Sequence, residues 1–208
     1  MKVQIVLFDG FDELDAIAPF EVLKTAAEVG ADVRVELVTL DGASEVVAAH
    51  GLLVRPEGQL DPDDRPDVLV VPGGGWNSRA SKGAWGESQR GELTEAIARL
   101  YKLGTTVATV CTGGMLAQAA GLTTGRPATT HHGAVEELRA SGTEVVDARV
   151  VDDGDLITAG GVTSGLDLAL WLVERYFGVD VALSVQREME YERRGTVAGA
   201  EGRSFGIS

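Results

Sequence analysis

Cysteine is almost absent from this chain, since Cys111 is the only one among 208 residues. A single cysteine excludes an internal disulfide and any metal site built from several cysteines. The chain also lacks an apolar run near the ~18 residues that a membrane-spanning helix needs. Its first stretch, MKVQIVLFDGFDELDA, has too short an apolar run for a signal peptide and continues into acids. A free thiol fits a reducing compartment, so these absences predict a cytoplasmic protein.

Basic residues are scarce as well: 18 Lys and Arg stand against 32 Asp and Glu, which gives a net charge of −14. No block of Lys and Arg interrupts this acidity, so the sequence argues against nucleic acid or an anionic membrane as a partner. The expected partner is therefore a small-molecule substrate. Three acids bunch at 152, 153 and 155, and we interpret them as solvated turn residues rather than a cation site. No metal site and no cofactor are expected.

Apolar strands alternate with helical patterns along most of the chain. Strands are predicted at 2–8, 32–40, 67–74 and 105–110, and hairpins at 45–58 and 148–161. Helices are predicted at 14–30, 87–104, 133–142, 164–178 and 180–194, with another from the cysteine to residue 121. Such strands predict an α/β fold with a mostly parallel sheet covered on both faces. We expect one domain over residues 1–195 and a flexible C-terminal tail over 196–208.

The cysteine lies where the strand pattern TTVATV ends and the helical pattern GGMLAQAAGL begins. A strand–turn–helix elbow of this kind exposes a side chain at the carboxyl edge of the sheet, where parallel α/β proteins bind ligands. The N–H groups at a helix N-terminus favour a thiolate, so we expect the pKa of Cys111 to be lowered. The alternative is an inert cysteine buried in the core.

Two other stretches end at the same edge. VVPGGG (70–75) carries a strand into three glycines whose bare amides, at Gly74 and Gly75 in particular, could stabilise an oxyanion. Asp15 begins a helical pattern, so it could be an N-cap or a carboxyl that exchanges protons with a substrate on Cys111. Trp76 follows the glycines and could wall a pocket or lie exposed on a loop.

Four stretches taken in order resemble the ThiJ/PfpI superfamily: LDAIAPFEVL, VVPGGG, ATVCTGGMLAQAAGLTTGRPATTHH and LITAGGVTSGLDLAL. The resemblance covers about residues 2–190. It implies a flavodoxin-like sandwich with a nucleophile elbow, and usually a homodimer. By position in these motifs, Cys111 matches the nucleophile and Asp15 the acid bonded to it. Gly74 and Thr112 match the oxyanion donors, and His131 matches a histidine found near the cysteine.

Thr112 follows the nucleophile where protease-like members carry histidine, and the remaining motifs look most like the isonitrile hydratase branch. The resemblance therefore implies hydration of isonitriles to N-substituted formamides, with Cys111 as nucleophile and Asp15 as acid and base. The same groups could instead convert 2-oxoaldehydes, with His131 as a proton shuttle, although His131 could also merely start a helix. Two non-enzymatic alternatives are a redox sensor that uses Cys111 and a ligand-binding module.

Overall fold

The computed structural model describes residues 1–199 of the chain. An eight-stranded sheet runs through its centre in the order β12-β10-β11-β7-β6-β1-β2-β5. The strands of this sheet are β1 (Lys2–Leu7), β2 (Arg34–Thr39), β5 (Gly58–Gln59), β6 (Val68–Val71), β7 (Thr106–Thr109), β10 (Val150–Asp152), β11 (Leu156–Ala159) and β12 (Val197–Ala198). All neighbours are parallel except β10 and β11. This is the predicted α/β fold.

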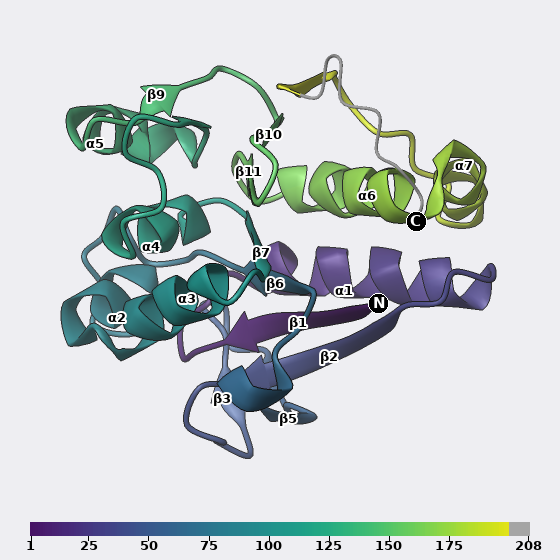
Figure 1. Cartoon of the computed structure of the whole chain (residues 1–208). Helices are drawn as coiled ribbons and strands as arrows, with labels where there is room; N and C mark the ends of the chain where they lie inside the picture. Colours follow the sequence, from purple (N-terminus) through teal and green to yellow (C-terminus); the bar gives the residue numbers. More distant parts are fainter. Residues whose placement is uncertain (200–208) are drawn as a thin grey trace.

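Helices cover both faces of the sheet (Figure 1). One group consists of α1 (Glu13–Glu28), α6 (Ser164–Phe177) and α7 (Val179–Glu188), which pack on one another. The other group consists of α2 (Ala84–Arg90), α3 (Glu92–Lys102) and α4 (Gly113–Ala119). The residues of β6 and β11 are all buried, as expected for strands with helices on both sides. No helix among the described residues is long and apolar enough to cross a bilayer.

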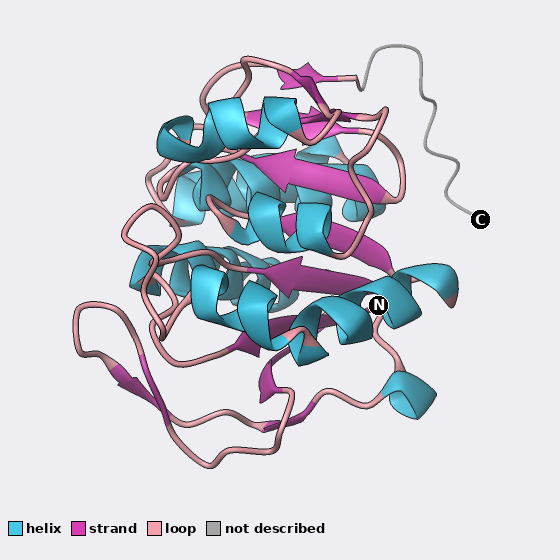
Figure 2. Ribbon diagram, turned by 90° about the vertical axis from the view of Figure 1, so that its left-hand side faces the viewer, coloured by secondary structure: helices cyan, strands magenta, loops and turns pink. Residues whose placement is uncertain are grey.

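Smaller elements complete the two ends of the sheet. The predicted hairpin at 45–58 forms between β3 (Val46–Val47) and β4 (Leu53–Val54), which pair antiparallel and stand apart from the main sheet (Figure 2). A second small pair joins β8 (Pro127–Ala128) to β9 (Glu144–Val145) beside α5 (Val135–Ala140). Two short 3₁₀ helices, η1 (Pro62–Asp64) and η2 (His132–Ala134), precede β6 and α5.

The predicted helix at 87–104 is in fact two helices. Gly91 separates α2 from α3 and has a φ of +87°, a left-handed conformation that an α-helix cannot contain. The amphipathic pattern continued across this break because both helices bury an apolar face, so periodicity alone did not reveal it.

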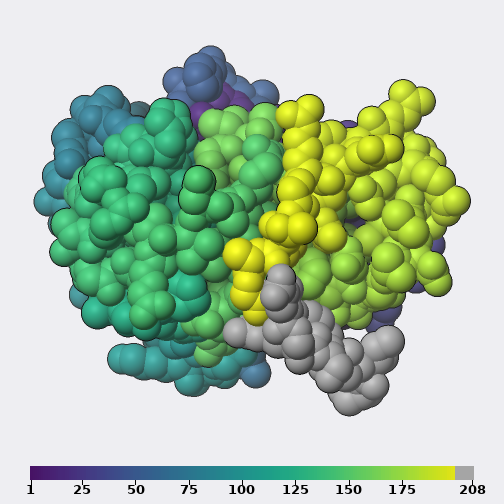
Figure 3. Space-filling model, turned by 90° about the horizontal axis from the view of Figure 1, so that it is seen from above, coloured from purple at the N-terminus to yellow at the C-terminus, as the bar shows by residue number. Residues whose placement is uncertain are grey.

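The prediction of a flexible tail from residue 196 is wrong for the first residues of that segment. Val197 and Ala198 form β12, which adds a parallel strand to β10 at the edge of the sheet. The segment leading there is held by Asp167, which accepts hydrogen bonds from the Tyr191 hydroxyl at 3.1 Å and the Arg194 N–H at 2.7 Å. It crosses the surface as a yellow band in Figure 3. The rest of the predicted tail, residues 200–208, lies outside the described residues.

The prediction that the three acids of the β10–β11 hairpin are solvated turn residues holds for Asp155, whose side chain is 59% exposed, and is wrong for Asp152. Asp152 is completely buried and accepts hydrogen bonds from Arg175 at 2.8 Å and from the Trp171 indole at 2.8 Å. Asp153 and Asp155 both form ion pairs with Arg126, each at 2.6 Å. These carboxylates therefore fasten the hairpin to α6 and to the loop before β8.

Candidate active site

Cys111 lies in the predicted elbow, between the end of β7 and the start of α4. Its backbone φ is +56°, a left-handed conformation that is uncommon for a residue with a side chain. The turn is held by its own backbone: the Cys111 N–H donates to Gly160 O at 2.9 Å, and its carbonyl accepts from the Thr130 hydroxyl at 2.9 Å. The residue is 5% exposed, so its side chain is almost completely buried.

Asp15 lies in the first turn of α1 and is completely buried. The N-cap of that helix is Asp12, whose side chain accepts from the Leu14 N–H at 3.3 Å, so Asp15 is free of the capping role. Oδ2 of Asp15 accepts from the Gly73 N–H at 3.0 Å. Oδ1 has no hydrogen-bond partner among the described residues, while the thiol of Cys111 interacts with the same carboxyl. The fold thus brings the two predicted groups together.

Burial governs the protonation of this pair. It is the main reason that the pKa of Asp15 is raised to about 8, and the charge of Asp12 adds to the effect. The pKa of the Cys111 thiol is raised to about 12, mainly by burial and secondly by repulsion from Asp15. The predicted lowering of the thiol pKa is therefore wrong, because the loss of hydration outweighs the N–H groups of Val162 and Thr112 that face the sulfur. At neutral pH the carboxyl holds a proton, as an acid catalyst must.

The glycine loop after β6 comes very close to this pair. A Cβ on Gly73 would lie 2.5 Å from the Thr112 nitrogen, and a Cβ on Gly74 would lie 2.5 Å from Gly10 O, so neither position has room for a side chain. The Gly74 N–H was predicted to be bare, but it donates to the Thr112 hydroxyl at 2.9 Å. Gly75 lines a surface hollow next to Gly74. The Thr112 hydroxyl thus links the glycine loop to the elbow through a hydrogen bond.

Val162 was missed by the sequence analysis. It follows β11 in the turn before α6, and its N–H faces the sulfur of Cys111. Its φ is +39°, which is strained for a β-branched side chain and costs on the order of 1–3 kcal/mol. The signal available in the sequence was the pair of glycines before it in LITAGGV, which marks a sharp turn after a strand. Nothing local indicates that this turn reaches Cys111.

His131 starts η2, and its Nδ1 accepts from the Gly133 N–H at 3.1 Å. This is the helix-starting role that the sequence left as one alternative. Burial lowers the pKa of His131, and His132 lowers it further, so the ring is neutral at pH 7. Trp76 is 4% exposed and is therefore not an exposed loop aromatic. Its ring packs edge-on against Trp85, and its Nε1 donates to Glu137 at 3.0 Å.

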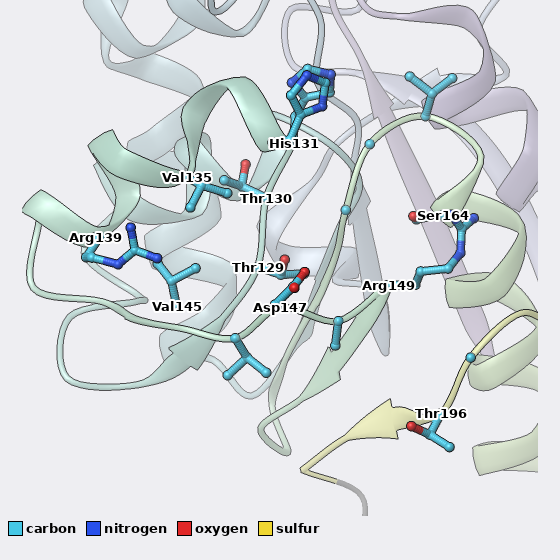
Figure 4. A pocket seen from close by; sticks show the side chains of 17 residues that line it. Thr129, Thr130, His131, Val135, Arg139, Val145, Asp147, Arg149, Ser164 and Thr196 are labelled. Atoms are coloured by element: carbon cyan, nitrogen blue, oxygen red, sulfur yellow. The ribbon is translucent and has the colours of Figure 1, made fainter.

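Three surface hollows are lined by residues of the loops around the elbow, although Cys111 itself is not among their lining residues. The largest, of about 900 Å³, lies beside His131 and reaches Val162 (Figure 4). A shallow hollow of about 690 Å³ also contains Val162 and is lined by Asp12, Glu13, Leu14, His50, Leu52 and Val162. The third, of about 470 Å³, shares Asp12 and His50 with it and contains the glycine loop. Within the described residues, no three His, Cys, Asp or Glu side chains are placed to share a metal ion.

Known proteins with similar sequences and structures include enzymes. The chain is 35% identical over 191 residues to the isonitrile hydratase of Pseudomonas putida, which covers 92% of this chain and 78% of that protein. It is 30% identical to a deglycase of Thermococcus kodakarensis over 76% of this chain and 89% of that protein.

The fold matches that of a ThiJ/PfpI family protein from Pseudomonas syringae with a TM-score of 0.80 and 24% identity, over 97% of this chain and 78% of the other. The model of the DJ-1/PfpI family matches residues 1–175. These matches extend over the strands and helices that hold Cys111, Asp15 and the glycine loop. The protein is therefore a member of the DJ-1/PfpI family.

Proposed function

We propose that this protein hydrates isonitriles to N-substituted formamides, without a cofactor and as a homodimer. The observation that carries the proposal is the buried carboxyl of Asp15, which holds a proton near neutral pH beside the thiol of Cys111. An isonitrile needs both a proton and a nucleophile on one carbon atom, and this pair supplies both. The similarity to the isonitrile hydratase of Pseudomonas putida supports the same chemistry.

The first step joins the substrate to the enzyme. Asp15 gives its proton to the terminal carbon of the isonitrile while the sulfur of Cys111 forms a bond to that carbon. The thiol proton passes to the Asp15 carboxylate, so the site keeps one proton and the product is a thioimidate. The sulfur needs no free thiolate beforehand, which fits a thiol whose pKa is raised. This is nucleophilic catalysis with one group acting as acid and base.

The second step releases the product. Asp15 gives its proton to the imidate nitrogen and takes one from the attacking water, which forms a tetrahedral adduct. Collapse of the adduct breaks the carbon–sulfur bond, and the hydroxyl proton returns to the sulfur, so that the formamide leaves and the thiol is restored. The Thr112 N–H, which faces the sulfur of Cys111, would donate to the oxygen of the adduct.

The direct test uses cyclohexyl isocyanide with the wild-type protein and the Cys111→Ala variant. We expect the wild type to form N-cyclohexylformamide, measured by mass spectrometry, and the variant to form none above the rate without enzyme. Circular dichroism of both proteins controls for folding. Formamide from neither protein, or equal amounts from both, would rule out the proposal.

Thr112→Val is expected to slow turnover by roughly 5–100-fold, because the partly buried Gly74 N–H loses its acceptor while the side chain keeps its shape. Thr112→Ser restores the hydroxyl and should stay within a few-fold of the wild type. Steady-state kinetics with cyclohexyl isocyanide measures both variants. If Thr112→Ser is as slow as Thr112→Val, the methyl group rather than the hydroxyl is what matters.

A second enzymatic candidate is the conversion of 2-oxoaldehydes through a hemithioacetal on Cys111. The 30% identity to a deglycase supports this second reaction. Methylglyoxal offered to the same pair of proteins distinguishes the two reactions, because a hydroxy acid rather than a formamide would accumulate. A redox sensor is less well supported, since oxidation by peroxide requires a thiolate and the pKa of Cys111 is raised.

A further inference from the structure

The shallow hollow formed by Asp12, Glu13, Leu14, His50, Leu52 and Val162 has no role in the two steps above. Here we call it the Leu14 hollow. It adjoins the reacting groups on two sides: Leu14 precedes Asp15 in the chain, and Val162 presents its N–H to the sulfur of Cys111. A molecule whose tip reaches the sulfur past Val162 would leave its remaining part in this hollow.

The floor of the Leu14 hollow is apolar. Leu14 is 38% exposed and Leu52 is 45% exposed, and they are two of the eight large aliphatic side chains that are exposed within residues 1–199. Leu14 projects outward because its neighbour Asp15 occupies the buried side of the first turn of α1. Exposed aliphatic groups beside a reactive centre are a feature of sites that bind apolar parts of ligands.

Leu52 is held in place by Glu13. The Glu13 carboxylate accepts from the His50 N–H at 2.7 Å and from the His50 ring at 2.6 Å, and more weakly from the Leu52 N–H at 3.5 Å. These bonds tie the β3–β4 hairpin to the start of α1. The position of Leu52 is therefore fixed relative to Leu14, although Leu52 belongs to a hairpin outside the main sheet.

The rim of the Leu14 hollow carries acids. Asp12 and Glu13 line it, and His50 is the one basic group that does so, already bonded to Glu13. The charge of Asp12 also reaches both Asp15 and Cys111. An anionic substituent entering here would meet like charge, whereas a neutral apolar one would bury its surface against Leu14 and Leu52.

We propose that the Leu14 hollow selects the substrate: Leu14 and Leu52 bind a neutral apolar substituent, and Asp12 excludes anionic ones. This inference rests on the proposed function for its substrate class, neutral isonitriles with a hydrocarbon group. The shape of an isonitrile suits the arrangement, because its terminal carbon is a narrow, linear tip that can reach the sulfur while the substituent stays outside.

The test first uses alkylation of Cys111, which does not require turnover. Three probes share one leaving group: N-benzyl iodoacetamide is apolar, iodoacetamide is small and neutral, and iodoacetate is anionic. We expect Leu14→Gln and Leu52→Gln each to lower the rate ratio of the benzyl probe to iodoacetamide by about 10-fold, the range that a lost apolar contact gives. Leu53→Gln is the matched control, since Leu53 is 53% exposed on the same hairpin and does not line the hollow.

Asp12→Asn tests the charge, and asparagine keeps the helix cap. We expect it to raise the ratio of iodoacetate to iodoacetamide several-fold, and using a ratio cancels any change in thiolate fraction. Unchanged ratios in all three variants would overturn the proposal. An equal fall of the ratio of the benzyl probe to iodoacetamide in Leu53→Gln would also overturn it. So would a loss of dimers in the leucine variants, measured by analytical ultracentrifugation, without a change in that ratio, because a second copy of the chain would then cover these residues.

Turnover of cyclohexyl isocyanide and isocyanoacetate separates this inference from the proposed function. If neither substrate gives formamide while the alkylation ratios change as expected, the proposed function fails and the selective hollow stands. If formamide forms but Leu14→Gln leaves the preference for the cyclohexyl substrate unchanged, the hollow is not the substituent site and the proposed function stands.

Discussion

Asp15→Asn is expected to reduce isonitrile turnover by about 10²–10⁴-fold, the usual contribution of a positioned acid–base group. Asparagine has nearly the same shape as aspartate, and its carbonyl oxygen can still accept from the Gly73 N–H. It cannot give a proton to the isonitrile carbon. Steady-state kinetics with cyclohexyl isocyanide measures the loss, and Asp9→Asn, at a partly exposed carboxylate, is the control.

The same Asp15→Asn variant should leave the thiol reactive, which separates chemistry from misfolding. In the wild type Asp15 carries a charge only above its pKa of about 8, and that charge opposes the thiolate of Cys111. Removing the charge should therefore speed alkylation by iodoacetamide, and the gain should be largest above pH 8. Full turnover in the variant would show that Asp15 is not the acid, and slower alkylation at every pH would show that it mainly shapes the site.

Arg175→Met is expected to lower the free energy of unfolding by about 3–5 kcal/mol, because it removes the guanidinium that pairs with the buried carboxylate of Asp152. At about 2–4 °C per kcal/mol for a chain of this size, the melting temperature should fall by roughly 6–20 °C. Differential scanning calorimetry measures the change. Asp152 lies at the end of β10 away from Cys111, since Val150 rather than Asp152 pairs with Ala159. Turnover per folded molecule should therefore stay unchanged.

Two further variants show whether the loss of stability in Arg175→Met comes from the buried charge. Asp152→Asn combined with Arg175→Met removes both charges of the pair and should recover a large part of the loss, because breaking a buried pair costs more than replacing both of its members. Arg187→Met is the matched control, since within residues 1–199 the Arg187 side chain donates to the Ser184 hydroxyl and to no carboxylate. If Arg175→Met costs less than about 1 kcal/mol, the pair behaves like a surface ion pair and the buried-charge argument is wrong.

Local patterns predicted much of the fold correctly. The buried strands at 67–74 and 105–110 and both hairpins could be predicted because strand and helix periodicities are local properties of the chain. Gly91 shows the limit of this approach: a glycine within an amphipathic run can either stay helical or break the helix. Here its left-handed conformation ends α2, and packing of α2 and α3 as separate helices decided between the two.

Residues of the site were predicted better than their electrostatics. The elbow geometry of Cys111 follows from a strand, two glycines and a helix, all adjacent in the sequence. The pKa of its thiol depends on hydration and on Asp15, which is 96 positions away in the chain, so local sequence suggested a shift in the wrong direction. Val162 was missed for the same reason, because only the folded chain brings its N–H to the sulfur.

The sequence by itself determined the order of the main strands and most of the helices, the elbow at Cys111 and the glycines that let the chain turn beside it, because these depend on short-range backbone preferences. Only the tertiary structure decided that Asp15 is buried against the thiol, that the Gly74 N–H is taken by Thr112, and that Asp152 pairs with Arg175. Burial and long-range contacts set proton affinities and hydrogen-bond partners, and both arise when distant segments pack together.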